Sequence, residues 1–410
     1  MSGQEIIAGL DLGSTKVCAI VGEKTEDGGV DIIGVGSVPS KGLKKGVVVN
    51  IESTVQSIRA AIEQAEAMAG VDINTVYAGI AGSHVRGFNQ EGVAAIANRE
   101  VDHADVLRVL EQAKAIPLPG DRQVLHVLPQ EFIVDEQDGI REPVGMSGVR
   151  LEVRAHIVTA ATTSVQNIIK CAERCGLYVA EVVLQPLASS DAILSEDEKE
   201  IGVVIIDIGG GTTDLMIYVD GAVVHTSVIP MGGINLTNDI ATGLRTPMAE
   251  AERIKIKYGC ASPDLVDTEE TMEVPSVGGR PARVVPRQLL CDIVEPRVEE
   301  FFSACRHVIE ETGYGSMLAS GAVITGGSTL LDGMSDVAER VLGLPVRRGH
   351  AVAVGGLVDV VRSPAYATAV GLVKYGARQV ADEQPMVDVL ESGSAGRLSR
   401  KIGQWFREVF

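Results

Sequence analysis

The chain has 410 residues, 45% hydrophobic and 22% charged, and a formal net charge of −19. This balance predicts two or more folded domains, and the negative charge excludes a general nucleic-acid binder, which needs clustered Lys and Arg. The six cysteines are too few for a disulfide framework, the start MSGQEIIAGLDLG lacks a secretory pattern, and no run approaches about 20 apolar residues, so we expect a cytosolic chain without a membrane span.

Two stretches of the sequence share one pattern. Residues 6–22 (IIAGLDLGSTKVCAIVG) and 203–221 (VVIIDIGGGTTDLMIYVDG) both consist of an apolar strand, an Asp, a Gly-rich turn with Ser or Thr, and a second apolar strand. Such turns between β-rich runs predict hairpins. Their separation by about half the chain indicates two related halves.

Helices are predicted between and after these hairpins from apolar residues at helical spacing. Residues 177–194 and 321–343 are each typical of a strand, a turn and a helix. Within the longest predicted helix, Pro296 indicates a kink or a boundary. The simple helices are expected over 50–70, 163–176, 286–313 and 363–378.

Residues 85–161 interrupt the first half and have their own helix, HADVLRVLEQAKAI, and strands, HVLPQEFIVD and RLEVRAHIVTA. We interpret this segment as an inserted subdomain. After Gly376 the sequence becomes polar and acidic without periodicity, which predicts a disordered linker over 377–395.

The two Gly-rich turns are either simple tight turns or a phosphate cradle. Asp11 and Asp207 precede the turns, where a carboxylate could hold a hydrated divalent cation. Backbone N–H groups and hydroxyls suit phosphate oxygens, and Lys16 adds a positive charge. The Walker pattern is absent, since each turn leads into a strand rather than a helix. The hydroxyls belong to Ser14, Thr15, Thr212 and Thr213.

Two further segments suit the nucleoside part of a ligand. The turn TGGSTLLDG at 325–333 comes between a strand and a helix, whose N-terminus favours an anion or a polar group. Glu252 and Lys255 lie three residues apart on one predicted helix face. The alternative for this second pair is an ordinary surface ion pair.

These motifs together resemble the actin-like ATPase superfamily. DLGSTK, DIGGGTTD and TGGST match its two phosphate motifs and its adenosine motif, and LQPLASS and AYATAVGLV match its connecting helices. The resemblance implies a two-lobed α/β fold of the actin-like, ribonuclease-H-like type that binds ATP and Mg²⁺. It also implies that Asp11 and Asp207 position Mg²⁺ through water and that Gln185 orients the attacking water. The nucleotide-binding residues implied are Gly13, Ser14, Thr15, Lys16, Gly209, Gly210, Gly211, Thr212, Thr213, Asp214, Gly232, Gly233, Glu252, Lys255, Gly326, Gly327 and Ser328.

Within the superfamily, the inserted segment is most similar to that of the FtsA family. By this resemblance, 1–84 with 162–198 form subdomain IA, 85–161 form IC, 199–244 with 318–376 form IIA, and 245–317 form IIB. The resemblance implies an adaptor that polymerises at the cytoplasmic side of the cell membrane at mid-cell and anchors the FtsZ ring of the division septum, with at most slow ATPase activity. The alternatives are an actin-fold metabolite kinase and an MreB-like filament protein.

The last residues, 396–410, predict an amphipathic helix with an apolar stripe and a side-chain charge of +3. Such a helix lies in a membrane interface rather than spanning it. Packing on the protein's own surface is the alternative. The predicted membrane-binding residues are Arg397, Leu398, Arg400, Lys401, Ile402, Trp405, Phe406, Arg407, Val409 and Phe410.

The family resemblance also implies partners. The FtsZ C-terminal tail is expected on the second inserted region, with Arg287 and Arg297 contacting its acidic groups, unless they are ordinary solvated arginines. Other divisome proteins are expected on 85–161, anionic lipid on the tail, and further copies of the chain in a filament.

Overall fold

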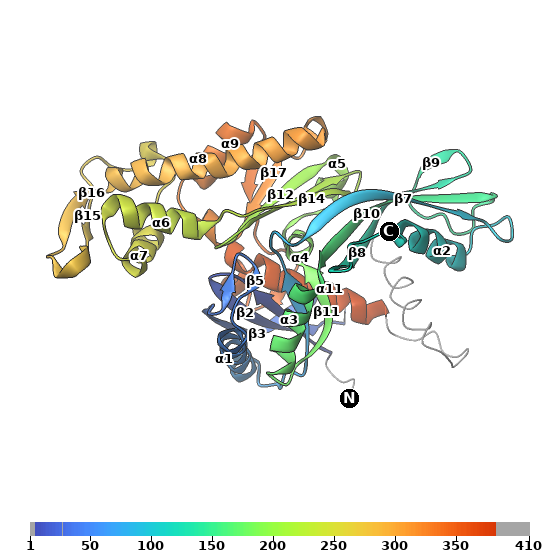
Figure 1. Cartoon of the computed structure of the whole chain (residues 1–410), viewed down its shortest axis with the longest axis horizontal. Coiled ribbons are helices and arrows are strands. Elements are labelled where there is room, and N and C mark those ends of the chain that lie inside the picture. The colour runs from blue at the N-terminus through green and yellow to red at the C-terminus, as the bar shows by residue number, and fades with distance from the viewer. Residues whose placement is uncertain (1–4, 27, 383–410) are drawn as a thin grey trace.

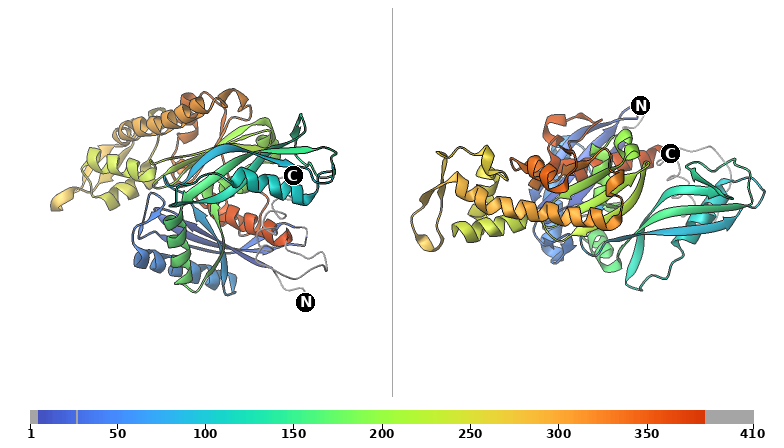
Figure 2. Two further views of the ribbon diagram at one scale, coloured as in Figure 1. Left: turned by 45° about the vertical axis from the view of Figure 1, so that its right-hand side comes forward. Right: turned by 90° about the horizontal axis from the view of Figure 1, so that it is seen from above.

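The computed structural model describes residues 5–26 and 28–382. They form two lobes, each built around one large β-sheet, and two smaller parts that extend from opposite ends of the molecule (Figures 1 and 2). One of these parts is a four-stranded sheet with one helix, and the other is a helical arm.

The first lobe contains a six-stranded sheet in the order β11-β6-β1-β2-β3-β19. The hairpin predicted over 6–22 is confirmed, because β1 and β2 pair antiparallel, whereas β1 and β6 pair parallel. The strands are β1 (Ile6–Leu12), β2 (Lys16–Lys24), β3 (Val30–Pro39), β6 (Thr75–Ile80), β11 (Tyr178–Leu184) and β19 (Gly355–Gly356).

Two helices of the first lobe, α1 (Ile51–Ala69) and α3 (Thr162–Glu173), pack on each other, and they agree with the sequence-based prediction. The Asn50 side chain accepts a bond from the Ser53 N–H and so satisfies one of the free donors at the start of α1. A two-stranded ribbon, β4 (Leu43–Lys44) and β5 (Val47–Val48), leads into α1.

The second lobe repeats the plan of the first with the order β14-β13-β12-β17-β18. Here β12 pairs antiparallel with β13 and parallel with β17, as β1 does with β2 and β6. The predicted second hairpin and the relation between the halves are therefore confirmed. The strands are β12 (Val203–Ile208), β13 (Thr213–Val219), β14 (Ala222–Ile229), β17 (Ala322–Thr325) and β18 (Val346–Arg348).

Helices α4 (Gln185–Ile193) and α11 (Ala367–Asp382) pack together where the lobes meet. The α4 helix contacts strands of both large sheets, and α11 packs on β1, β2 and β6. A Cβ atom on Gly371 of α11 would overlap the backbone carbonyl of Ala188, so the two backbones touch at this crossing.

The third sheet, in the order β7-β10-β8-β9, has α2 (His103–Lys114) packed on it around a separate apolar core. The predicted helix and two strands in this region are confirmed, but β7 was not predicted because RGFNQEG lacks apolar alternation. His156 hydrogen-bonds Thr226 of β14 at 2.9 Å and so links this sheet to the second lobe. The strands are β7 (Arg86–Ala95), β8 (Arg122–Val134), β9 (Gln137–Ile140) and β10 (Arg150–Ala161).

The helical arm extends from the second lobe opposite this sheet (Figure 2). Its longest helix, α8, continues through Pro296, so of the two predicted alternatives, a kink or a boundary, the boundary is wrong. Buried residues on both sides of the proline, such as Val294 and Val298, pack into one core and hold the helix together. The arm and its neighbour α9 comprise α6 (Gly233–Leu244), α7 (Met248–Tyr258), β15 (Thr271–Val274), β16 (Arg283–Pro286), α8 (Arg287–Thr312) and α9 (Met334–Leu342).

Short helical elements complete the described chain. They include two α-helices, α5 (Glu196–Ile201) and α10 (Val358–Val361). The 3₁₀ turns are η1 (Pro263–Leu265), η2 (Val277–Gly279), η3 (Gly315–Met317), η4 (Gly327–Leu330) and η5 (Pro364–Tyr366).

The linker predicted over 377–395 needs a correction, because α11 continues to Asp382. Tyr375 and Ala377 are buried, so packing extends the helix beyond the point where the sequence loses its clear pattern. The remainder of the predicted linker and the predicted membrane helix at 396–410 lie outside the described residues. Among the residues described, no helix is long and apolar enough to cross a membrane.

Candidate functional site

A cavity of about 480 Å³ lies between the lobes and is lined by both Gly-rich turns. The turns of the two hairpins face each other across it. A Cβ atom on Gly210 would overlap Thr15, and one on Gly211 would come within 2.6 Å of the Ser14 hydroxyl. Glycine at these two positions therefore lets the lobes approach closely enough to form one site.

The first turn is closed by a hydrogen bond of 2.9 Å from the Gly13 N–H to the Lys16 carbonyl. The Lys16 side chain does not simply extend into the cavity. Its ammonium group donates to the Ala365 carbonyl and lies 4.1 Å from the ring centre of Tyr366. Lys16 thereby joins the first hairpin to the segment that begins α11, while it still lines the cavity.

The second turn is closed in the same way, by a 3.0 Å bond from the Gly209 N–H to the Thr212 carbonyl. Two further residues of this region order the start of α6: the Gly233 and Ile234 N–H groups donate to the Gly209 and Gly210 carbonyls. The motif 209–213 and the glycines at 232–233 therefore form one continuous backbone unit.

Three carboxylates, Asp11, Asp207 and Asp214, line the cavity and are all buried. Burial raises the pKa of Asp11 to about 6. The positive charge of Lys16 counteracts this increase, and the negative charge of Asp207 adds to it. Burial also raises the pKa of Asp207, and hydrogen bonds from Ser189 and Thr368 partly counteract this increase. For Asp214, burial and the charge of Asp207 raise the pKa to about 8.

One oxygen of these carboxylates is fully buried and has no hydrogen-bond partner. The Gln185 amide donates to Asp11 at 3.0 Å, Ser189 donates to Asp207 at 2.9 Å, and Thr212 donates to one oxygen of Asp214 at 3.0 Å. The other oxygen of Asp214, Oδ1, is buried and unpaired. A buried, unpaired carboxylate oxygen beside two other acids fits a site for a hydrated cation.

Direct coordination by protein groups alone is a poorer fit. Within residues 5–26 and 28–382, no group of three or more His, Cys, Asp or Glu side chains has metal-binding geometry. Mg²⁺ commonly keeps several waters and binds through one or two carboxylates together with phosphate oxygens. The donor set is therefore compatible with a cation that arrives with phosphate groups.

The cavity is also lined by α7 and the third glycine turn. The predicted contact between Glu252 and Lys255 exists at 2.8 Å, but it is more than a surface ion pair. Lys255 is buried and also donates to the Gly233 carbonyl at 3.1 Å and to Thr237 at 2.9 Å. Lys255 thus joins α6 to α7 at the cavity wall.

The third turn packs directly against the second hairpin. Gly326 has φ +90°, and a Cβ atom there would overlap Asp207, so this position requires glycine. The Ser328 hydroxyl donates to the Gly209 carbonyl at 3.0 Å. By contrast, a Cβ atom on Gly327 would meet only Ala365, at 3.8 Å, so this residue leaves open space at the cavity.

The predicted site residues are thus largely brought together around one cavity, although Thr213 and Gly232 are not among its lining residues. Thr213 donates instead to the Met231 carbonyl at 2.9 Å. Sequence reasoning missed Ser189 and Thr368, which both donate to Asp207 from α4 and α11. Small polar residues within the first turns of the two connecting helices were the available signal.

The two arginines predicted to contact the FtsZ tail lie on α8 and are already paired. Arg287 donates to Glu270 at 2.9 Å and to the Tyr258 carbonyl at 2.8 Å. Arg297 donates to both oxygens of Asp239, at 2.6 and 3.2 Å, and also to Glu300. Both guanidinium groups are therefore already paired with carboxylates of the protein.

The predicted membrane-binding residues fall within 383–410 and outside the described part of the chain. Their assignment stays a prediction.

Comparison with known proteins places this geometry in a family. Residues 204–371 match the family model for the cell division protein FtsA, and residues 82–159 match the model for the SHS2 domain inserted in FtsA. The chain is 51% identical to the cell division protein FtsA of Pseudomonas aeruginosa, over 93% of this chain and 92% of that protein. It is 41% identical to FtsA of Escherichia coli K12, over 99% of both chains.

Solved structures support the actin-like fold. The chain of a PilM–PilN type IV pilus biogenesis complex superposes with a TM-score of 0.65 at 17% identity, covering 90% of this chain and 98% of that one. MreB5 of Spiroplasma citri bound to ADP gives a TM-score of 0.55 at 13% identity, covering 92% and 97%. The sequence-based predictions of an actin-like fold and of the family are both confirmed, and the chain belongs to the FtsA family of cell division proteins.

Proposed function

We propose that this cell division protein binds ATP with Mg²⁺ between its lobes, polymerises on the cytoplasmic face of the cell membrane and anchors FtsZ there. The observation that carries the nucleotide part is the pair of opposed glycine turns beside three buried carboxylates, one of which has an unpaired oxygen. Membrane and FtsZ binding rest on the family and on the sequence of the tail.

The residues of the cavity have distinct roles in this proposal. Backbone N–H groups of residues 14–15 and 210–212 donate to phosphate oxygens, which the close approach of the turns makes possible. Asp11, Asp207 and Asp214 hold the waters of Mg²⁺, whose charge neutralises the phosphate oxygens when it is bound. The open space at Gly327 accepts the nucleoside.

Hydrolysis is at most slow in this proposal. The Gln185 side-chain N–H that would orient a water donates to Asp11, so that water must replace this bond or be held by the amide oxygen of Gln185. The function of the site in this proposal therefore depends on nucleotide binding rather than on hydrolysis. Rapid phosphate release by the protein without lipid or a partner would contradict this assignment.

The first prediction tests the site directly. Asp207→Ala removes a group that we place on the waters of Mg²⁺, and Gly327→Asp adds bulk and negative charge to open space. Losing one charge-assisted hydrogen bond costs about 1.5–3 kcal/mol, so each variant should bind ATP–Mg²⁺ about 10–100-fold more weakly by isothermal titration calorimetry. Gly120→Ala, at a glycine with nothing within 4 Å, is the control. Unchanged affinity in both cavity variants would refute the site.

The second prediction concerns pH. Because the pKa of Asp214 is raised to about 8 in the folded state, the folded protein binds more protons than the unfolded chain between about pH 4 and pH 8. This carboxylate therefore lowers stability increasingly as pH rises through that window. Asp214→Asn should raise the melting temperature of the ligand-free protein at pH 8 but hardly at pH 4.

Calorimetric melts of variant and parent at both pH values measure the difference in melting temperature. Titrating groups that Asp214 does not affect contribute equally to both proteins and drop out of this difference. The same variant should be stabilised less than the parent by ATP–Mg²⁺. A constant difference in melting temperature across the pH range would show that folding does not raise the pKa of Asp214.

The third prediction concerns the tail. Burying six apolar side chains at about 1.5–3 kcal/mol each is largely offset by ordering some 14 residues at about 1–2 kcal/mol each. Binding of one tail should therefore be weak, and a filament should strengthen it by presenting many tails. Deleting 396–410, or Trp405→Glu, should abolish co-sedimentation with anionic liposomes while ATP binding is kept.

Arg400→Glu combined with Lys401→Glu should weaken binding to anionic vesicles more than to neutral ones, since each basic residue near anionic lipid contributes about 1 kcal/mol. The matched control makes the same charge change on exposed residues of the folded body, Arg99→Glu with Arg280→Glu. Equal losses in the two double variants would indicate net charge rather than a lipid-binding tail.

The fourth prediction concerns FtsZ. An acidic peptide that binds Arg297 must displace the carboxylates that bind this arginine in the structure. Arg297 therefore contributes only the difference between its bonds to the peptide and its bonds to those carboxylates. Arg297→Ala should weaken binding of an FtsZ C-terminal peptide about tenfold in fluorescence anisotropy. Arg306→Ala, on the same helix and paired with Glu310 at 2.7 Å, is the control. An equal loss in both variants would assign the effect to overall charge.

A further inference from the structure

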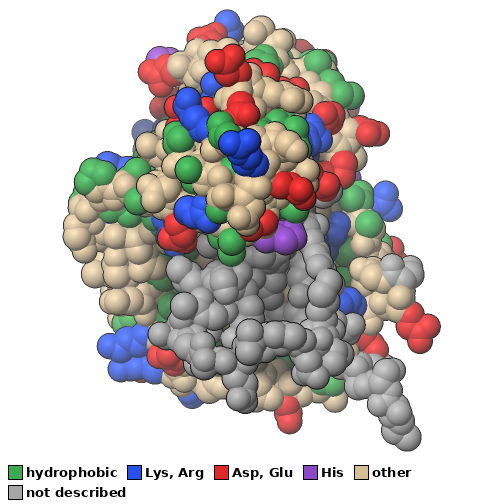
Figure 3. Space-filling view, turned by 90° about the vertical axis from the view of Figure 1, so that its right-hand side faces the viewer, with side chains coloured by type: hydrophobic (Ala, Val, Ile, Leu, Met, Phe, Trp, Pro, Cys, Tyr) green, Lys and Arg blue, Asp and Glu red, His purple; other side chains and the backbone are tan. Residues whose placement is uncertain are grey.

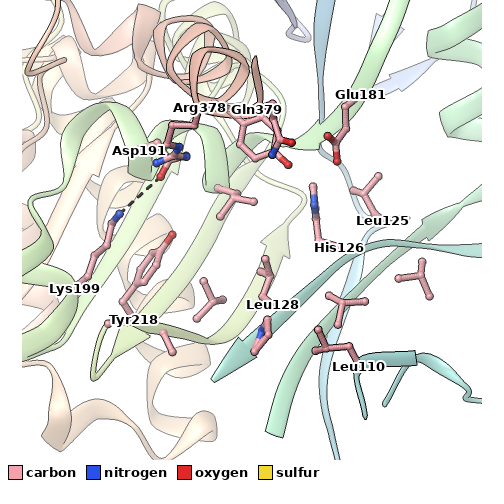
Figure 4. A pocket seen from close by; sticks show the side chains of 18 of the residues that line it. Leu110, Leu125, His126, Leu128, Glu181, Asp191, Lys199, Tyr218, Arg378 and Gln379 are labelled. Carbon is pink, nitrogen blue, oxygen red and sulfur yellow. Dashed lines mark hydrogen bonds and ion pairs between the residues drawn. The ribbon is translucent and has the colours of Figure 1, made fainter. Parts of the chain in front are cut away.

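A second cavity, of about 380 Å³, lies where the inserted sheet, α4, β13 and the end of α11 meet (Figure 4). It shares no lining residue with the cavity between the glycine turns. The close-up shows Leu125, His126 and Leu128 coming from β8, and Arg378 and Gln379 coming from α11. The roles assigned above to the molecule do not use this cavity.

The chemistry of its walls favours an apolar or aromatic occupant. Leucines and valines from β8, together with Leu110, Leu187 and Tyr375, supply apolar surface. Several charged groups of the wall pair with one another: Lys199 lies 2.9 Å from Glu196 and 3.7 Å from Asp191, which also binds Arg378. A volume of this size is typical of ligand sites, and this lining combines apolar side chains with charged ones.

We propose that this cavity is a docking site for the chain's own C-terminal segment, with Trp405 as the anchoring side chain. The first support is connectivity. Arg378 and Gln379 are part of the cavity wall, and the described chain ends three residues later, at Asp382. The segment that follows thus starts beside the cavity.

The second support is reach. Trp405 comes 23 residues after Asp382, and an extended chain of that length spans at most about 80 Å. A tethered group at such a separation has an effective concentration on the order of 1 mM. Even a weak intrinsic affinity of the cavity for an indole would then keep the tail docked for much of the time.

The third support is charge. Residues 383–410 contain four acidic and four basic side chains, so residues 1–382 carry the whole net charge of −19, while 396–410 alone carry +3. Asp and Glu side chains are spread over the described surface at this end of the molecule (Figure 3). The basic tail is therefore attracted to the acidic body that contains the cavity.

This inference rests on the proposed function of the tail and deepens it, because one segment cannot occupy lipid and cavity together. A docked fraction of nine-tenths would lower the apparent affinity for lipid tenfold. The cavity would then act as a store from which tails are released when anionic membrane competes for them.

The fifth prediction is read from Trp405, the only Trp of the chain. In dilute, lipid-free protein, the emission maximum of Trp405 should lie at a shorter wavelength than that of the isolated 396–410 peptide. Acrylamide should also quench this emission less in the protein than in the peptide. Leu125→Glu, which places a charge at a half-buried cavity position, should shift the emission to the red. The same variant should bind anionic liposomes about 3–10-fold more tightly than the parent.

The matched control is Val149→Glu, the same kind of change at a position that is 60% exposed in the inserted subdomain and does not line the cavity. It should leave both readings unchanged, and thermal melts establish that both variants are folded. The comparison between parent protein and isolated peptide needs no variant, so it can refute docking even if Leu125→Glu does not fold.

The possible outcomes separate the two proposals. Peptide-like emission and quenching in the parent would overturn docking while leaving lipid binding untouched. Blue-shifted emission without liposome binding in any variant would support docking and refute the membrane anchor. A blue shift that disappears on dilution would mean that the tail occupies the cavity of a second copy, which would overturn docking within one chain.

Discussion

The structure depends on the crossing of α4 and α11 where the two lobes meet. At Gly371 no side chain is tolerated, because a Cβ atom would overlap the Ala188 carbonyl. The helices carry the groups that bind the acids of both lobes: Gln185 of α4 donates to Asp11, and Thr368 of α11 donates to Asp207 at 3.3 Å. The relative position of the hairpins is thus set by two helices that pack on each other.

The acids at this crossing are destabilised as long as nothing else neutralises them. Burial raises the pKa values of Asp11, Asp207 and Asp214, and the charge of Asp207 also repels those of Asp11 and Asp214. The cation that we propose for this site would remove both penalties and so stabilise the arrangement that binds it. The buried acids therefore lower the stability of the ligand-free protein, and perturbed acids of this kind are common at functional sites.

The sequence predicted the parts of the site that depend on local backbone chemistry. The glycine turns and the acids that precede them could be assigned because a strand, a turn and a strand are specified by neighbouring residues. The unpaired oxygen of Asp214 and the bonds from Ser189 to Asp207 could not, because they join residues that only the tertiary fold brings together. The paired state of Arg297 and the unbroken helix at Pro296 are tertiary effects of the same kind.

Helices α4 and α11 contribute residues to both cavities, which connects the two proposals. Both helices donate to the acids of the first cavity, and Asp191 of α4 binds Arg378 of α11 in the wall of the second cavity. The close contact at Gly371 is a physical route by which a ligand that shifts these helices at one cavity would also shift them at the other. Coupling between binding sites is reciprocal, so any effect of nucleotide on release of the tail implies an equal effect of tail docking on nucleotide affinity.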